Sequence, residues 1–178
     1  MTQVKGKFIT LTLGLMSPYR KAFTQADAVV LRQTGSHWNE LDPEGWYDVQ
    51  IFGEAMELYA RASITGDKAL ITLGREIYPT IKQTSGLPAH LKTPLEFILY
   101  EAEGYLANTR GEGVKPRRFI HSREGDVLVE APAPGYNPKL FIGVFLGILE
   151  MCGVQTGKVI QTKAERNGDG TDEFHITW

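Results

Sequence analysis

The side chains best suited to chemistry in this chain are four histidines, because imidazole can bind a metal ion or transfer a proton near neutral pH. They are His37, His90, His121 and His175. No two of them are four residues apart, the spacing that brings a pair to one face of a helix, and none has the neighbouring carboxylates that a helical metal site uses. The sequence therefore predicts no metal site.

Catalytic motifs are missing from the sequence. It contains no Gly-x-Ser-x-Gly elbow, phosphate loop, dinucleotide-binding glycine pattern or paired-cysteine redox motif. Cys152 is the single cysteine and ends an apolar segment, where burial would raise the pKa of its thiol and make it unreactive. We therefore expect the protein not to be an enzyme.

Several aromatic and polar side chains are candidates for ligand binding. Trp46, Tyr47 and Phe52 surround the start of a predicted helix, where such residues either belong to the core or line an apolar pocket. Arg75 either pairs with a neighbouring carboxylate or holds an acidic group of a ligand. Tyr136 would supply a further polar group. These five residues are the predicted ligand-binding site.

A basic group precedes and enters a predicted strand. Its members are Lys115, Arg117, Arg118 and Arg123. The group would suit an acidic partner or a phosphate, and a solvated strand edge explains it equally well.

Composition narrows the functional classes. Nineteen Lys and Arg residues against 21 Asp and Glu give a net charge of -2, which provides no positive field for nucleic acid. The longest apolar segment covers residues 140–153, fewer than the roughly 20 residues that cross a bilayer. A single cysteine excludes an intramolecular disulfide. We expect a cytoplasmic protein that neither binds nucleic acid nor spans a membrane.

Helical periodicity dominates the first half of the chain. It predicts helices over residues 26–31, 49–60, 67–81 and 93–107, while the segment 4–15 fits either a strand or a short helix.

Two of these predicted helices have further signals. Pro79 should bend the third helix or shift its boundary. Thr93 and Pro94 are typical of the start of the fourth. The apolar face expected for that fourth helix consists of Leu95, Ile98, Leu99, Ala102 and Leu106.

Strand signals cluster in the second half. Residues 119–120 and 127–129 form one predicted hairpin, and residues 158–164 and 173–178 form another around Asn167 and Gly168. An apolar helix over residues 140–151 lies between them. Helices followed by hairpins indicate a single α+β domain over residues 1–178, with N-terminal helices packed on a C-terminal antiparallel sheet.

The apolar helix contains Gly143 and Gly147, four residues apart. Small residues at this spacing allow another backbone to approach closely, and packing on the sheet is favoured over dimerisation. The apolar character of nearly every face also leaves burial by a second subunit open.

Short motifs in this order resemble a family of uncharacterised bacterial proteins that is abundant in myxobacteria. The motifs are Val4-Lys5-Gly6, Gly45-Trp46-Tyr47, Leu73-Gly74-Arg75 and Tyr136-Asn-Pro followed by Gly143, Gly147, Glu150 and Gly153. The wider superfamily includes haem-based nitric oxide and oxygen sensor domains, vinyl reductase-like (V4R) domains and subunits of Golgi transport particles. The resemblance implies helices that close over a sheet around an apolar cavity.

The chain departs from the haem sensors of this superfamily at their characteristic residues. Those sensors carry a proximal histidine on a central helix, but residues 93–107 contain none and His90 lies before them. Their Tyr-x-Ser-x-Arg motif has no match better than His121-Ser122-Arg123. Residues 163–174 also lack the cysteines common in vinyl reductase-like domains. We therefore expect no haem, no metal and no other cofactor.

Two functions fit these observations. The first is a non-catalytic sensor or binding module for a small hydrophobic molecule, coupled to a protein partner or acting as a homodimer. The second is a scaffold or assembly subunit that acts through a protein interface without a ligand.

Overall fold

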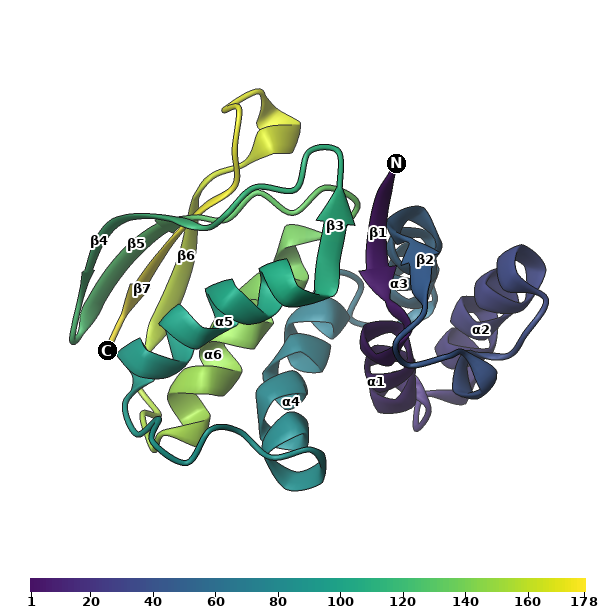
Figure 1. Cartoon of the computed structure of the whole chain (residues 1–178), viewed down its shortest axis with the longest axis horizontal. Coiled ribbons are helices and arrows are strands. Elements are labelled where there is room, and N and C mark those ends of the chain that lie inside the picture. Colours follow the sequence, from purple (N-terminus) through teal and green to yellow (C-terminus); the bar gives the residue numbers. More distant parts are fainter.

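The computed structural model describes residues 1–178 and contains six α-helices and two antiparallel sheets (Figure 1). The helices are α1 (Gly6–Met16), α2 (Arg20–Thr34), α3 (Val49–Ala62), α4 (Lys68–Thr84), α5 (Pro94–Asn108) and α6 (Pro138–Met151). The strands are β1 (Thr2–Lys5), β2 (Trp46–Asp48), β3 (Thr109–Gly111), β4 (Arg118–Arg123), β5 (Asp126–Glu130), β6 (Lys158–Lys163) and β7 (Glu173–Thr177). Short 3-10 helices cover Trp38–Glu40 and Glu165–Asn167.

The larger sheet has the strand order β4-β5-β7-β6 and consists of the two predicted hairpins, joined where β5 pairs with β7. Alternate residues of β5 and β7 are buried beneath α6, whose Phe145 ring lies 5.7 Å from the ring of Phe174. α6 thus covers one face of this sheet, and α1, α2 and α3 form the opposite end of the molecule (Figure 1). The predicted α+β architecture, with an apolar helix between two hairpins, is confirmed.

A second, three-stranded sheet was not predicted. β1 pairs with both β2 and β3, so the first residues of the chain are held against the segment that follows α5. The sequence of residues 4–15 fitted either a strand or a short helix. The segment contains both, because β1 ends at Lys5 and α1 begins at Gly6. A β-carbon at Gly6 would overlap the backbone carbonyl of Asp42, so the change of direction requires glycine there.

Helix boundaries differ from the predictions in two places. α2 is longer than predicted, since Ala22, Ala26, Val29 and Val30 continue one buried face before Gly35 ends the helix in a left-handed conformation with φ 77°. α4 runs through Pro79 to Thr84, so a boundary shift at the proline is wrong. The helix is anchored on the N-terminal side of the proline, where Leu73, Ile77 and Tyr78 are buried in the core.

α5 begins as predicted, with the Thr93 hydroxyl accepting from the Glu96 N–H in a capping box. Its predicted apolar face is right at Ile98, which is buried, and wrong at Leu99 and Leu106, which are 39% and 42% exposed. The buried residues of the helix are Pro94, Phe97, Ile98, Glu101 and Tyr105. An apolar pattern could not identify all of them because a buried ion pair, described below, draws the carboxylate of Glu101 inward.

The close approach predicted at Gly143 and Gly147 occurs, but against α4 rather than against the sheet. β-Carbons at these two positions would overlap the backbone carbonyls of Ile71 and Arg75, and one at Gly74 would overlap the backbone of α6. Three glycines therefore form a seam along which the two helices touch. None of the helices combines the length and apolar composition that a bilayer span needs.

Candidate ligand-binding cavity

A cavity of about 310 Å³ lies between α1, α4, α5 and α6. Twenty residues line it, and 12 of these are hydrophobic, among them Leu11, Ile77, Ile81, Leu140 and Val144. Ligand pockets in proteins are typically about 300 to 1,000 Å³ and mostly apolar, with a few polar groups that orient the ligand. The size and lining therefore fit a small organic molecule.

The hydrophobic residues of the lining include four tyrosines, Tyr78, Tyr100, Tyr105 and Tyr136, whose hydroxyl groups add polar atoms. The polar and charged residues of the lining are Lys7, Thr84, Ser85, Glu101, Asn108 and Thr109. Burial raises the pKa values of the Tyr78, Tyr105 and Tyr136 phenols above their usual range. These three groups are therefore neutral at physiological pH and can donate or accept a hydrogen bond.

The Tyr105 hydroxyl is buried and has no hydrogen-bond partner. Buried polar atoms almost always have a partner, and an unpaired one costs about 1–3 kcal/mol. Tyr105 is also one of the residues that line the cavity.

A buried ion pair fixes the wall behind Tyr105. Arg117 donates from Nη2 to Oε1 of Glu101 at 2.9 Å and from Nη1 to the backbone carbonyl of Pro132 at 3.1 Å. Its guanidinium carbon lies 3.8 Å from the centre of the Tyr105 ring. The arginine thus holds both the carboxylate and the aromatic ring of α5 in place.

One of the five predicted site residues, Tyr136, lines the cavity. The Phe52 ring lies 5.2 Å from the Tyr136 ring but belongs to the fully buried core. Arg75 forms an ion pair with Glu150 of α6 at 3.3 Å, which is the structural alternative considered for it.

Trp46 and Tyr47 also lie away from the cavity lining. The Arg110 guanidinium carbon lies 4.2 Å from the centre of the Trp46 ring, and Tyr47 Oη accepts from the Asp42 N–H at 3.0 Å. These contacts stabilise β2 and the turn before it. The sequence did not predict four other residues that line the cavity: Tyr78, Tyr100, Glu101 and Tyr105. Polar residues on the buried side of a helix could have indicated them.

The basic group of the sequence is largely neutralised. Arg117 is buried with Glu101, Arg118 Nε donates to Glu130 at 2.7 Å, and Arg123 Nη2 donates to Asp126 at 2.6 Å. Three of its four members are therefore already paired with carboxylates.

Solved structures similar to this chain include H-NOX proteins. The Fe(II) unliganded H-NOX protein from K. algicida has 16% sequence identity and a TM-score of 0.69, over 97% of this chain and 95% of that one. A mutant of T. tengcongensis H-NOX has 14% identity and a TM-score of 0.68, over 97% and 94%. A structure from work on heme distortion in the H-NOX family has 15% identity and a TM-score of 0.67, over 97% and 93%.

No protein-family model matches the chain, and no curated protein matches it by sequence. At these low identities the structural likeness establishes the fold, and the chain has the H-NOX fold over nearly its whole length.

The residues around the cavity do not fit a haem. Histidine, cysteine and methionine are common protein ligands of haem iron, and none of them lines the cavity. Tyrosine can also bind haem iron, but as the phenolate, which the raised pKa values of the buried phenols disfavour. The nearby cations are also engaged: Arg117 pairs with Glu101, and Lys7 pairs with Glu44 at 3.1 Å. The fold is shared with haem proteins, whereas the lining of this cavity contains no histidine, cysteine or methionine.

Proposed function

We propose that this protein is a non-catalytic binding module that takes up a small, largely apolar molecule in the cavity beneath α5. The unpaired hydroxyl of Tyr105 in a mostly apolar lining carries this proposal. The ligand would bury its apolar part against α4 and α6 and accept a hydrogen bond from Tyr105 through one polar atom.

The proposal assigns no reaction to the cavity. Its buried phenols are neutral, the Glu101 carboxylate is paired with Arg117, and the Lys7 ammonium is paired with Glu44. Catalytic acids and bases need a free group with a pKa near the working pH.

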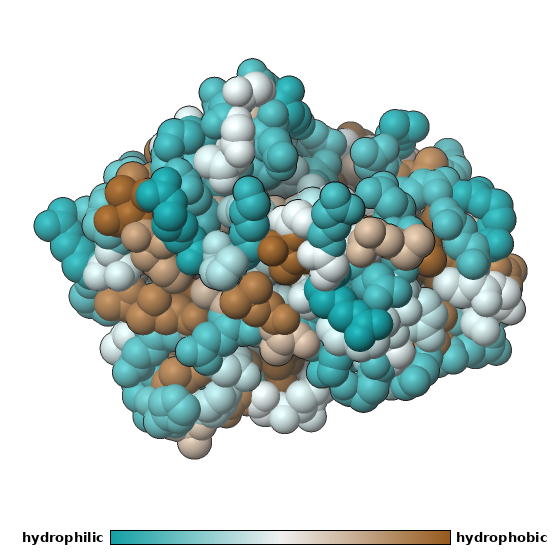
Figure 2. Space-filling model, turned by 45° about the horizontal axis from the view of Figure 1, so that its top comes forward, coloured by the Kyte–Doolittle hydropathy of each residue, from teal (hydrophilic) through white to brown (hydrophobic).

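We further propose that ligand occupancy is read by a protein partner or a second copy of the chain, in the cytoplasm. We also propose that the chain belongs to the bacterial family that its sequence motifs resemble. The scaffold alternative is less well supported, because a large exposed apolar patch would favour it. On the face shown in Figure 2, hydrophobic residues form small groups separated by hydrophilic ones.

Binding of two matched probes tests the ligand proposal. Toluene is apolar throughout, and acetophenone adds one hydrogen-bond acceptor to a similar ring. We expect wild-type protein to bind acetophenone more tightly than toluene, by the roughly 0.5–1.5 kcal/mol typical of one net hydrogen bond. In Tyr105→Phe, which removes only the hydroxyl, this preference should disappear while toluene binding persists.

A cavity-filling variant is the control. Leu11→Trp places a larger side chain into the lining and should abolish binding of both probes, with circular dichroism showing that the fold is kept. The proposal is wrong if neither probe binds the wild type in calorimetric titrations, or if Leu11→Trp binds them as the wild type does.

A further inference from the structure

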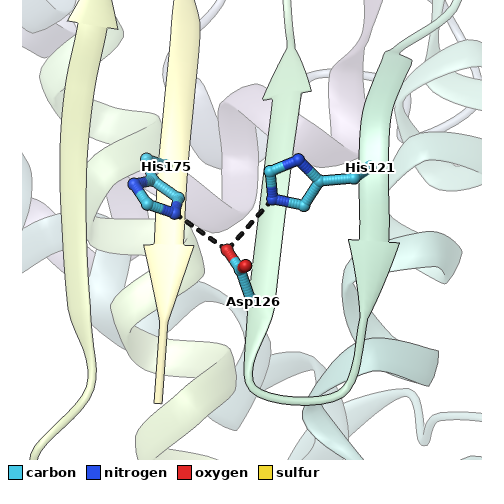
Figure 3. Close-up of side chains that lie close together, drawn as sticks. All are labelled: His121, Asp126 and His175. Atoms are coloured by element: carbon cyan, nitrogen blue, oxygen red, sulfur yellow. Dashed lines mark hydrogen bonds and ion pairs between the residues drawn. The ribbon is translucent and has the colours of Figure 1, made fainter.

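We propose that His121, Asp126 and His175 form a binding site for a divalent transition-metal ion on the exposed face of the four-stranded sheet (Figure 3). The site lies outside the cavity and does not depend on the function proposed for it. It was not predicted because the two histidines are far apart in sequence and come together only through strand pairing.

Strand register brings the three side chains to one face. His121 of β4 lies opposite Leu128 of β5, and Leu128 lies opposite His175 of β7. Asp126 precedes Leu128 by two residues, and side chains two apart on a strand point to the same side. Val127 and Val129 point to the other side, where they are buried in the core.

The three groups converge on one point. Nε2 of His121 lies 3.0 Å from Oδ1 of Asp126, and Nε2 of His175 lies 2.8 Å from the same oxygen. Figure 3 shows the two imidazole rings reaching toward this carboxylate from opposite sides, each from a different strand. The three potential ligand atoms all lie within 4.8 Å of one another.

A metal ion can replace the hydrogen bonds of this cluster. An ionised carboxylate only accepts, so both Nε2 atoms carry a proton when they bond to Asp126. Each Nε2 gains a free lone pair when its proton moves to Nδ1, or is released to solvent from a protonated ring, and metal–ligand distances of about 2.0–2.2 Å then require the rings to turn. Both rings are free to do so, since the side chains of His121 and His175 are 41% and 38% exposed.

The donor set selects the class of metal. Two imidazoles and one carboxylate suit Zn²⁺, Cu²⁺ or Ni²⁺, whereas Ca²⁺ and Mg²⁺ prefer sites made of oxygen ligands only. Three protein ligands also leave a fourth position of a tetrahedral zinc ion open for water or an external ligand.

Arg123 holds the carboxylate in position for this role. It donates from Nε and Nη2 to Oδ2 of Asp126, at 3.2 and 2.6 Å, and leaves Oδ1 facing the histidines. Hydrogen bonds that orient a ligand in this way are common around protein metal sites.

The test is a zinc titration of untagged, chelator-treated protein by isothermal calorimetry. We expect one equivalent of Zn²⁺ to bind, and no heat from Ca²⁺. His121→Gln and His175→Gln keep a donor for Asp126 and so preserve the hydrogen bond, but each removes one metal ligand. Each should weaken zinc binding by about tenfold or more.

His90→Ala is the matched control, because His90 is exposed and lies in the loop before α5, outside the cluster. It should bind zinc as the wild type does. The proposal is overturned if the wild type binds no zinc, if both glutamine variants retain wild-type affinity, or if His90→Ala loses binding to the same extent. Long-range ¹H–¹⁵N spectra provide a second readout, in which zinc should remove the Nε2 protons of His121 and His175.

Discussion

Arg117 and Glu101 form a two-point ion pair inside the protein, with Nη2 2.9 Å from Oε1 and Nε 3.3 Å from Oε2. The side chain of Arg117 is fully inaccessible to solvent, and that of Glu101 is 7% exposed. Because Arg117 immediately precedes β4 and Glu101 lies on α5, the pair connects the larger sheet to the helix that forms one wall of the cavity.

Removing one member of this ion pair should destabilise the protein more than replacing both members with apolar residues. Arg117→Met or Glu101→Leu alone leaves one charge buried without its partner, and each should lower the free energy of unfolding by about 3–5 kcal/mol. The double variant Arg117→Met with Glu101→Leu should be much closer to wild type, because both charges are gone. Urea denaturation of the four proteins gives this double-mutant cycle.

The exposed Arg118 provides the control for the cycle. It pairs with Glu130 at the surface, so Arg118→Ala should change the stability by no more than about 1 kcal/mol. If the double variant loses as much free energy of unfolding as the sum of the two single variants, the ion pair is not the source of the loss of stability.

The seam between α4 and α6 should not tolerate a single added methyl group. Gly74→Ala places a β-carbon into the backbone of α6, and the forced separation of the helices should cost at least about 1–3 kcal/mol. Gly104→Ala makes the same change on α5, where the nearest atom, Tyr78 Oη, is 3.8 Å away. It should stabilise the protein by about 0.5–1 kcal/mol through helix propensity, and equal losses in both variants would contradict this account.

The contact between His37 and Asp27 should make part of the stability depend on pH. The hydrogen bond from Nδ1 of His37 to the Asp27 carboxylate raises the pKa of His37 above 6.5. A raised pKa in the folded state means that this contribution is fully present below pH 6.5 and is lost as the pH rises through the folded-state pKa.

Melting temperatures of the wild type and His37→Asn at several pH values test this dependence. The difference between them should be largest at mildly acidic pH and should shrink in mildly alkaline buffer. A difference that grows with pH would have the wrong sign for the proposed contact.

Cys152 should react slowly with alkylating reagents. Burial is the main cause that raises the pKa of its thiol, which leaves less thiolate near neutral pH. Iodoacetamide should therefore modify the native protein more slowly than the protein unfolded in urea at the same pH, as followed by mass spectrometry. Equal rates would show that the thiol is not protected by the fold.

The sequence determined the local elements whose signals lie within a few residues. The capping pair of Thr93 and Glu96, the turns of the two hairpins and the continuous apolar run of α6 were readable because each depends on short-range hydrogen bonding or periodicity. Of the predicted ligand-binding residues, Tyr136 alone lines the cavity.

Tertiary structure decided the features that join residues distant along the chain. β1 is a strand because β2 and β3 supply its hydrogen bonds, and Glu101 is buried because Arg117 neutralises it. His121 and His175 become neighbours only through the register of β4, β5 and β7. The sequence by itself thus determined five of the six helices, the hairpins and the α+β class. Only long-range pairing decided which polar groups lie together in the cavity and on the sheet.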